Sequence, residues 1–130
     1  MAQSTNRYSR LEILHNIGRE TMEKIRSLTI AVIGLGGTGS LSADLFCRAG
    51  VRKLLLIDRD FVDITNMHRQ ILFEESDIGR RKVDAACERL SRINSDVSYE
   101  SIFATFDAGN ALEITKKCDL VIDGTDSEDN

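Results

Sequence analysis

A cluster of glycines follows an apolar run, and its spacing is typical of a turn that binds phosphate. The run LTIAVIG ends at residue 34 and continues as LGGTGSL, which places glycines at Gly34, Gly36, Gly37 and Gly39. Glycines permit a tight turn and a close approach of the backbone, and a helix that starts here offers free N–H groups to an anion. The next apolar run ends at Asp58, a carboxylate suited to ribose hydroxyls. The pattern predicts a nucleotide and leaves open whether it is a redox dinucleotide or ATP.

Polar and cationic residues between positions 58 and 82 distinguish between a redox dinucleotide and ATP as the ligand. The stretches DRDFVDITNMHRQ (58–70) and DIGRRK (77–82) bring together Asn66, Arg69, Gln70 and Lys82. A nicotinamide enzyme needs no such concentration of cations beyond its second strand, whereas chemistry on ATP does. The set favours a triphosphate, with an NAD(P)-dependent Rossmann oxidoreductase as the alternative.

Four short runs predict the strands that position these residues. They are LTIAVIG (28–34), KLLLID (53–58), VSYESIF (97–103) and DLVID (119–123). Apolar runs without alternation suit strands buried on both faces of a parallel sheet, which we expect of 119–123 as well. The chain therefore reads as an α/β protein.

Helical spacing of apolar residues predicts the connecting helices. We expect them over 36–50, 80–94 and 107–117, with one or two amphipathic helices over 11–27 behind an exposed arm at 6–10. Right-handed crossovers then give a Rossmann-like, doubly wound, mainly parallel sheet preceded by N-terminal helices, with 119–123 at an open edge. Ligands of such sheets lie over the carboxyl ends of the strands, so residues 34–39, 58–60 and 123–126 should line one crevice.

Motifs along almost the whole chain resemble the E1-like adenylating superfamily, which includes the bacterial and archaeal ThiF, MoeB and HesA proteins and the adenylation domains of ubiquitin-type activating enzymes. In chain order these motifs are RYSR, GLGGTG, AGV, LLLIDRDFVDITNMHRQ, DIGRRK, RIN and DGTD. We accordingly divide the chain into an N-terminal arm with helices (1–27) and the ATP-binding, Rossmann-like half of an adenylation domain (28–130).

The resemblance implies a role for each matching residue. Gly37 would let the backbone close on the phosphates, and Asp58 and Asp60 would hold the ribose. Arg69 and Lys82 would pair the β- and γ-phosphates, with Asn66 and Gln70 beside them. Asp126 would hold Mg²⁺, which prefers oxygen ligands. The arginine of the N-terminal arm in this family can reach the active site of the other subunit of a dimer, a role that falls on Arg10.

The implied reaction is adenylylation of the C-terminal carboxylate of a small ubiquitin-like protein, of the sulfur-carrier kind used in thiamine or molybdopterin synthesis, with release of pyrophosphate. Members of the family continue for about as long again, so we expect a truncated second half that would supply further strands, carrier docking and, in many members, structural zinc. The 130 residues alone are then not expected to be a competent enzyme. A non-catalytic partner subunit with the same fold is the other alternative.

Composition restricts the partners further. The net charge of −4 offers no basic field for nucleic acid, and no apolar stretch approaches the roughly 20 residues of a membrane span. The N-terminus lacks the apolar segment of a secretory signal, so we expect a cytoplasmic protein. The resemblance to the E1-like superfamily implies that it is a homodimer. Cys47, Cys87 and Cys118 are far apart in sequence and are interpreted as buried thiols, not as metal ligands or nucleophiles.

Overall fold

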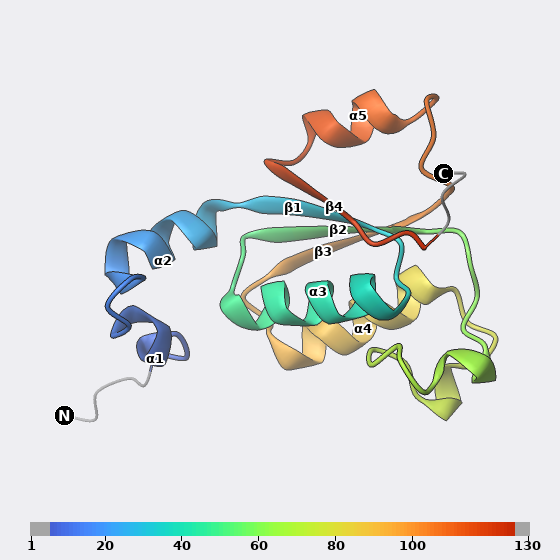
Figure 1. Cartoon of the computed structure of the whole chain (residues 1–130), viewed down its shortest axis with the longest axis horizontal. Helices are drawn as coiled ribbons and strands as arrows, with labels where there is room; N and C mark the ends of the chain where they lie inside the picture. The colour runs from blue at the N-terminus through green and yellow to red at the C-terminus, as the bar shows by residue number, and fades with distance from the viewer. Residues whose placement is uncertain (1–5, 127–130) are drawn as a thin grey trace.

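The computed structural model describes residues 6–126, which form one parallel sheet with helices on both of its faces (Figure 1). The strands are β1 (Thr29–Ile33), β2 (Lys53–Asp58), β3 (Ser98–Phe103) and β4 (Leu120–Asp123), in the spatial order β3-β2-β1-β4. Every neighbouring pair is parallel. This is the order in which a doubly wound sheet begins, so the predicted fold class is confirmed.

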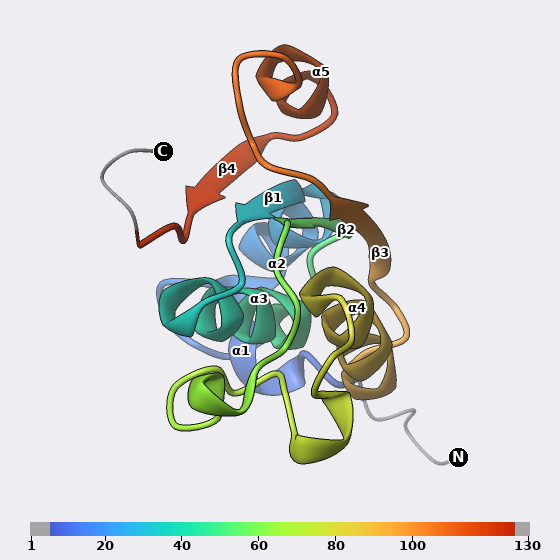
Figure 2. The ribbon, with the colours of Figure 1, turned by 90° about the vertical axis from the view of Figure 1, so that its right-hand side faces the viewer.

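Helices occupy the segments that the sequence predicted, except that the first begins at residue 9, inside the predicted arm at 6–10. They are α1 (Ser9–Glu12), α2 (Gly18–Ser27), α3 (Gly37–Ala49), α4 (Lys82–Ile93) and α5 (Ala111–Lys116), with 3₁₀ turns η1 (Ile64–Asn66) and η2 (Glu75–Asp77) between β2 and α4. Figure 2 shows α3 and α4 together on one face of the sheet and α5 on the other. In the part of the chain that the structure describes, no helix is both long and apolar enough to cross a membrane.

The two central strands send alternate side chains into two separate cores. Ile30 and Val32 of β1 pack with the core under α3 and α4, whereas Ala31 and Ile33 pack with the smaller core under α5. Successive residues of a strand point to opposite faces, and here both faces are covered. This explains why the β1 and β2 runs carry no polar alternation.

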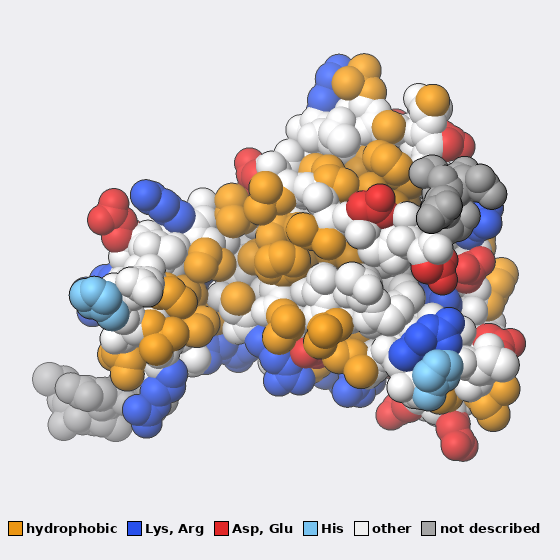
Figure 3. Space-filling view, viewed as in Figure 1, with side chains coloured by type: hydrophobic (Ala, Val, Ile, Leu, Met, Phe, Trp, Pro, Cys, Tyr) orange, Lys and Arg blue, Asp and Glu red, His pale blue; other side chains and the backbone are white. Residues whose placement is uncertain are grey.

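Helix α3 packs on the sheet through its small residues. Ser40, Ala43 and Cys47 are fully buried, whereas Leu41 and Leu45 are 50% and 57% exposed. Small side chains allow the helix to lie close to the strands, and this leaves the leucines pointing outward. Figure 3 shows hydrophobic side chains gathered over this face of the molecule.

Strand β4 differs from the prediction that it is buried. Among the strands of residues 6–126 it pairs only with β1, and Leu120 and Val121 are 48% and 41% exposed. The edge position itself was predicted, and the edge is the physical reason for the exposure, because no described strand covers the outer side of β4.

The interpretation of residues 6–10 as an exposed arm was also wrong in one respect. Tyr8 is only 2% exposed and counts among the core residues, and α1 begins at the next residue. A lone aromatic among polar neighbours gave no periodic signal, so its burial could not be read from the pattern.

Candidate active site

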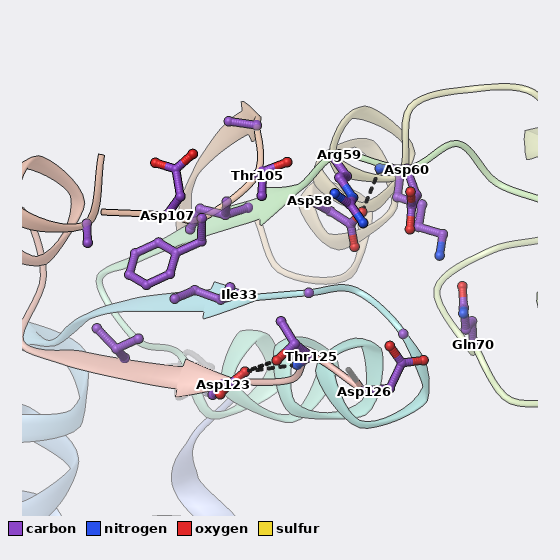
Figure 4. Close-up of a pocket in the computed structure, with 18 of the residues that line it drawn as sticks. Ile33, Asp58, Arg59, Asp60, Gln70, Thr105, Asp107, Asp123, Thr125 and Asp126 are labelled. Carbon is purple, nitrogen blue, oxygen red and sulfur yellow. Dashed lines mark hydrogen bonds between the residues drawn. The ribbon is translucent and has the colours of Figure 1, made fainter. Parts of the chain in front are cut away.

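A cavity of about 650 Å³ lies over the carboxyl ends of the strands, where the doubly wound topology places ligands. Its walls come from the turns after β1, β2, β3 and β4 and from the first turn of α4 (Figure 4). Of the predicted site residues, those that line it are Gly34, Gly36, Asp58, Asp60, Asn66, Arg69, Gln70, Lys82 and Asp126. Residues that are up to 92 positions apart in the chain, Gly34 and Asp126, therefore face one space.

The floor of the cavity is a contact between glycines. Gly34 has φ +84°, in the left-handed region that favours glycine, and a side chain on Gly39 would overlap the Gly34 carbonyl oxygen. A Cβ on Gly124, just after β4, would lie 2.8 Å from the same oxygen. The three glycines thus let the β1 turn, the start of α3 and the end of β4 pack backbone against backbone.

Helix α3 begins at the cavity, where its N-cap residue lines the wall and the Arg69 side chain lies against its first turn. Its N-cap is Gly36, no side chain caps it, and no acidic residue lies in its first turn. The free N–H groups and the positive end of the helix dipole form an anion-binding arrangement. A Cβ at Gly37 would touch only Arg69 side-chain carbons at 3.6 Å, so the protein itself does not require glycine there.

Asp58 connects the glycine turn with the segment after β2. One carboxylate oxygen accepts a hydrogen bond of 2.7 Å from the backbone N–H of Leu35, and the other accepts one of 2.7 Å from that of Asp60. Each oxygen retains acceptor capacity, so the carboxylate can also take hydroxyl donors. Asp60 is exposed beside it at the cavity wall.

Lys82 is a buried cation on the cavity wall, with 6% of its surface exposed. It is the first residue of α4, and its backbone N–H donates to the Asp60 carbonyl at 3.0 Å. Bonds from Val62 N–H to the Arg80 carbonyl (2.8 Å) and from Gly79 N–H to the Val62 carbonyl (2.9 Å) hold the two segments together. Within residues 6–126, Lys82 forms no ion pair. A lysine that is largely buried at the cavity wall, and whose ammonium has no ion-pair partner there, is suited to bind an anion in the cavity.

The η1 turn presents the remaining predicted polar groups. The side-chain oxygen of Asn66 accepts from the Asp63 N–H at 3.0 Å in a capping box, which leaves its amide N–H₂ available. Gln70 is 2% exposed, and its Oε1 has no hydrogen-bond partner in the described structure. An orphaned buried oxygen beside a cavity is costly unless a ligand satisfies it. The Arg69 guanidinium is exposed and rests on Thr65 O at 3.3 Å.

The wall opposite Asp58 is formed by the end of β4 (Figure 4). The Asp123 carboxylate accepts from the hydroxyl of Thr125 at 2.6 Å and from its backbone N–H at 3.0 Å, and these bonds lower the pKa of Asp123. Asp126 is exposed and is part of the cavity lining. Carboxylates from two sides thus face a cavity that is also lined by the cationic side chains of Arg69 and Lys82.

Predicted residue Arg10 lies elsewhere. Helix α1 is at one end of the molecule and the 58–82 loops are at the other (Figure 1). Gly39 supports the floor without lining the cavity, and Gly37 lies against Arg69.

Pattern analysis missed the part of the lining that follows β3. This set comprises Ala104, Thr105, Phe106, Asp107, Ala108 and Ala111. Together with Ile33 and Ile57 it supplies an apolar section of the wall. These residues carry no motif, and only the adjacency of β3 to β2 could have indicated them.

The cysteines supply no activated nucleophile. Burial raises the pKa of the Cys47 thiol, raises that of Cys87 to about 12, and raises that of Cys118. The buried-thiol interpretation holds for Cys47, while Cys87 and Cys118 are only partly buried. Reactive thiols have a lowered pKa, so none of the three is poised for attack.

Sequence comparisons place this geometry among known proteins. A model of the ThiF family matches residues 8–129. The chain is 38% identical over 121 residues to "Adenylyltransferase and sulfurtransferase MOCS3" of Culex quinquefasciatus, covering 93% of this chain and 28% of that protein. It is 35% identical over 125 residues to "Sulfur carrier protein ThiS adenylyltransferase" of Bacillus subtilis, covering 95% of this chain and 37% of that protein. The chain thus spans well under half the length of these curated relatives.

Solved structures show the same similarity in three dimensions. Escherichia coli MccB with ATP superposes with a TM-score of 0.85 at 28% identity, over 99% of this chain and 39% of that one. The E. coli tRNA N6-threonylcarbamoyladenosine dehydratase TcdA gives a TM-score of 0.86 at 30% identity, over 93% of this chain and 50% of that one.

Proposed function

The chain belongs to the ThiF family, and from this premise we propose that it is the ATP-binding half of an adenylyltransferase that activates a small ubiquitin-like sulfur carrier. The observation that carries the proposal is the cavity that combines an open helix N-terminus with a buried, unpaired Lys82 and the orphaned Oε1 of Gln70. The names of the relatives from C. quinquefasciatus and B. subtilis support adenylyl transfer, and the name of the second also supports a sulfur carrier as the substrate.

We assign each part of ATP to a part of the cavity lining. The phosphates would lie at the turn of Gly34 and Gly36, against the first N–H groups of α3. The Asp58 and Asp60 carboxylates would accept from the ribose hydroxyls. The base would lie against the apolar wall after β3, which includes Phe106.

Catalysis would consist of positioning and charge neutralisation. A carboxylate oxygen of the carrier attacks the α-phosphorus, the bond to the bridging oxygen of the β-phosphate breaks, and pyrophosphate leaves with the electron pair. Lys82 and Arg69 would offset the charge that develops on the departing phosphates, a role that matters more in the transition state than in the ground state. No protein nucleophile is required, which agrees with the raised thiol pKa values.

Magnesium fits the donors at the end of β4. Asp126 supplies exposed carboxylate oxygens at the cavity, the type of ligand that this hard cation prefers. Bound there, Mg²⁺ would neutralise phosphate charge. Structural zinc in the remainder of the protein stays a prediction.

The proposal includes a homodimer. Arg10 is separated from the cavity of its own chain by the length of the strands, six residues or about 20 Å in β2. It could therefore serve only the cavity of a second copy. Exposed apolar residues of α3 and β4, among them Leu41 and Leu120, also favour an interface that would bury them. We place this dimer in the cytoplasm, without nucleic acid or membrane as partners.

The decisive experiment is carrier-dependent ATP–pyrophosphate exchange with the natural full chain and a panel of purified ubiquitin-like carriers. We expect exchange with at least one carrier, and Arg69→Ala should lower kcat more than it lowers ATP affinity. Arg92→Ala is the matched control, because Arg92 is an exposed arginine that pairs with Glu88 at 3.0 Å outside the cavity lining. If the protein bound NAD(H) and showed no ATP–pyrophosphate exchange with any carrier, an oxidoreductase would replace the adenylyltransferase as the favoured function.

A further inference from the structure

Tyr8 is the anchor of the N-terminal segment. Its ring lies against Gly50 so closely that a side chain there would overlap it, and the Arg26 guanidinium of α2 lies over the ring at 5.0 Å. Its hydroxyl donates to Asp96 Oδ2 at 3.2 Å and accepts from Asn94 Nδ2 at 3.0 Å. Asn94 is itself buried and also donates to the Cys47 carbonyl at 2.8 Å. One side chain thus joins three parts of the fold to the chain start.

Helix α1 has no comparable attachment of its own. None of its four residues is buried, and Ile13 directly after it is 72% exposed. The Tyr8 carbonyl accepts from the N–H groups of Leu11 and Glu12 at 2.9 and 3.1 Å, so the residue that is anchored also starts the helix. Exposed Arg7 adds a hydrogen bond to the Ile93 carbonyl at 3.3 Å and an ion pair with Asp96 at 3.6 Å, but Tyr8 is the buried part of this attachment, so the position of α1 depends mainly on Tyr8.

Arg10 follows two residues after this anchor, with an exposed side chain that has no ion-pair partner among the residues the structure describes. The anchor sits on Gly50 and Asn94, before the first residues of β2 and β3, so it lies at the edge of the sheet opposite the cavity. An arginine held there cannot act on the ATP of its own chain.

We propose that Tyr8 is a positioning residue that fixes α1 at the amino-terminal edge of the sheet, so that Arg10 is presented at a set place to the cavity of a second copy of the chain. This rests on the proposed function. Fixing a long cation in advance reduces the ordering cost at the moment of reaction, which is the gain that preorganised charge gives a transition state. The loss of Tyr8 should therefore act on kcat through Arg10.

The test is subunit complementation in the exchange assay with the natural full chain. We expect Tyr8→Ala to lower kcat nearly as far as Arg10→Ala, and the double variant to be no worse than Arg10→Ala, because the two changes remove one contribution. Tyr8→Phe, which keeps the ring against Gly50, should restore most of kcat. The Arg69→Ala variant keeps Tyr8 and Arg10. It therefore supplies a correctly placed α1 together with an inactive cavity.

Mixing the inactive proteins distinguishes positioning in trans from general damage. Tyr8→Ala mixed with Arg69→Ala should regain about a quarter of wild-type activity, because half of randomly formed dimers are hybrids with one complete site. Tyr8→Ala mixed with Arg10→Ala should regain nothing, since no protomer presents Arg10.

Recovery in the second mixture, or none in the first, would overturn the role of Tyr8. The role of Tyr8 would also be overturned if Tyr8→Ala kept the wild-type kcat while Arg10→Ala was inactive. A wild-type protein without exchange activity would instead refute the proposed function, and the role of Tyr8 with it.

Discussion

Substitution of Gly39 by alanine should destabilise the fold through a single backbone contact. The new Cβ would overlap the Gly34 carbonyl oxygen and lie 2.8 Å from its carbon, where about 3.5 Å is the normal separation of carbon atoms. Relief requires a backbone shift of at least roughly 0.7 Å by that carbon-to-carbon distance. Gly34 cannot yield easily, because its N–H donates to the Ile57 carbonyl at 2.8 Å and Gly124 packs on its other side.

The two energetic effects of this change have opposite signs. Overpacking of this kind costs about 1–3 kcal/mol, and alanine returns up to about 1 kcal/mol over glycine inside a helix. We expect a net loss of about 1–2 kcal/mol at Gly39, measured as a lower urea midpoint at constant m-value by circular dichroism.

Gly37→Ala is the matched control for this prediction. It lies in the same turn, but its Cβ would meet only flexible Arg69 carbons at 3.6 Å, so stability should stay within about 0.5 kcal/mol of wild type. ATP binding should nevertheless weaken, by about tenfold or 1.4 kcal/mol, if the phosphates approach this backbone. Equal stability of Gly39→Ala and wild type, or equal destabilisation by both variants, would refute the reasoning.

Three other predictions follow from individual side chains. Lys82→Met should lower exchange activity at least about tenfold while leaving Tm unchanged or higher, because methionine keeps the largely buried aliphatic chain and removes a charge that has no ion-pair partner among the described residues; a fall in Tm would contradict this. Thr125→Val should raise the pKa of Asp123 toward its usual value of about 3.9, as read by NMR titration. Because the folded pKa is the lower one, the carboxylate stabilises the fold above about pH 3.9 and that contribution is lost as the pH falls through the folded pKa, so the variant should lose less stability in acid. Cys87, with a pKa of about 12, should react with iodoacetamide at pH 8 far more slowly in native protein than in urea, and equal rates would rule out its burial.

Local sequence patterns predicted the helices and strands well, because the formation of a helix or strand depends largely on residues that are close in sequence. The β2 run was predicted at 53–58 and spans Lys53–Asp58, and the helix predicted at 80–94 spans Lys82–Ile93. The exposure of β4 was misjudged for a nonlocal reason. An apolar run predicts a strand, but burial depends on whether another strand or helix covers it.

The helix predicted at 36–50 illustrates the same limit. Its leucines indicated a helix correctly, yet the contact with the sheet is made by Ser40, Ala43 and Cys47. Which face packs depends on how close the helix approaches the strands, and this is set by side chains elsewhere in the chain. The burial of Tyr8 likewise depends on residues far away in the chain, since its contacts Gly50 and Asn94 come from distant segments.

The sequence by itself determined the chemistry available to this protein. Glycines at a strand-to-helix turn, Asp58 after the next strand, and the Arg69 and Lys82 cations predict a phosphate ligand from residue types and spacing alone. Only the tertiary structure decided that Lys82 is buried without a partner and that Gln70 keeps an unsatisfied oxygen. It also placed helix α1, which includes Arg10, at the opposite end of the molecule from the 58–82 loops, because strand order and helix packing arise from contacts between residues far apart in the chain.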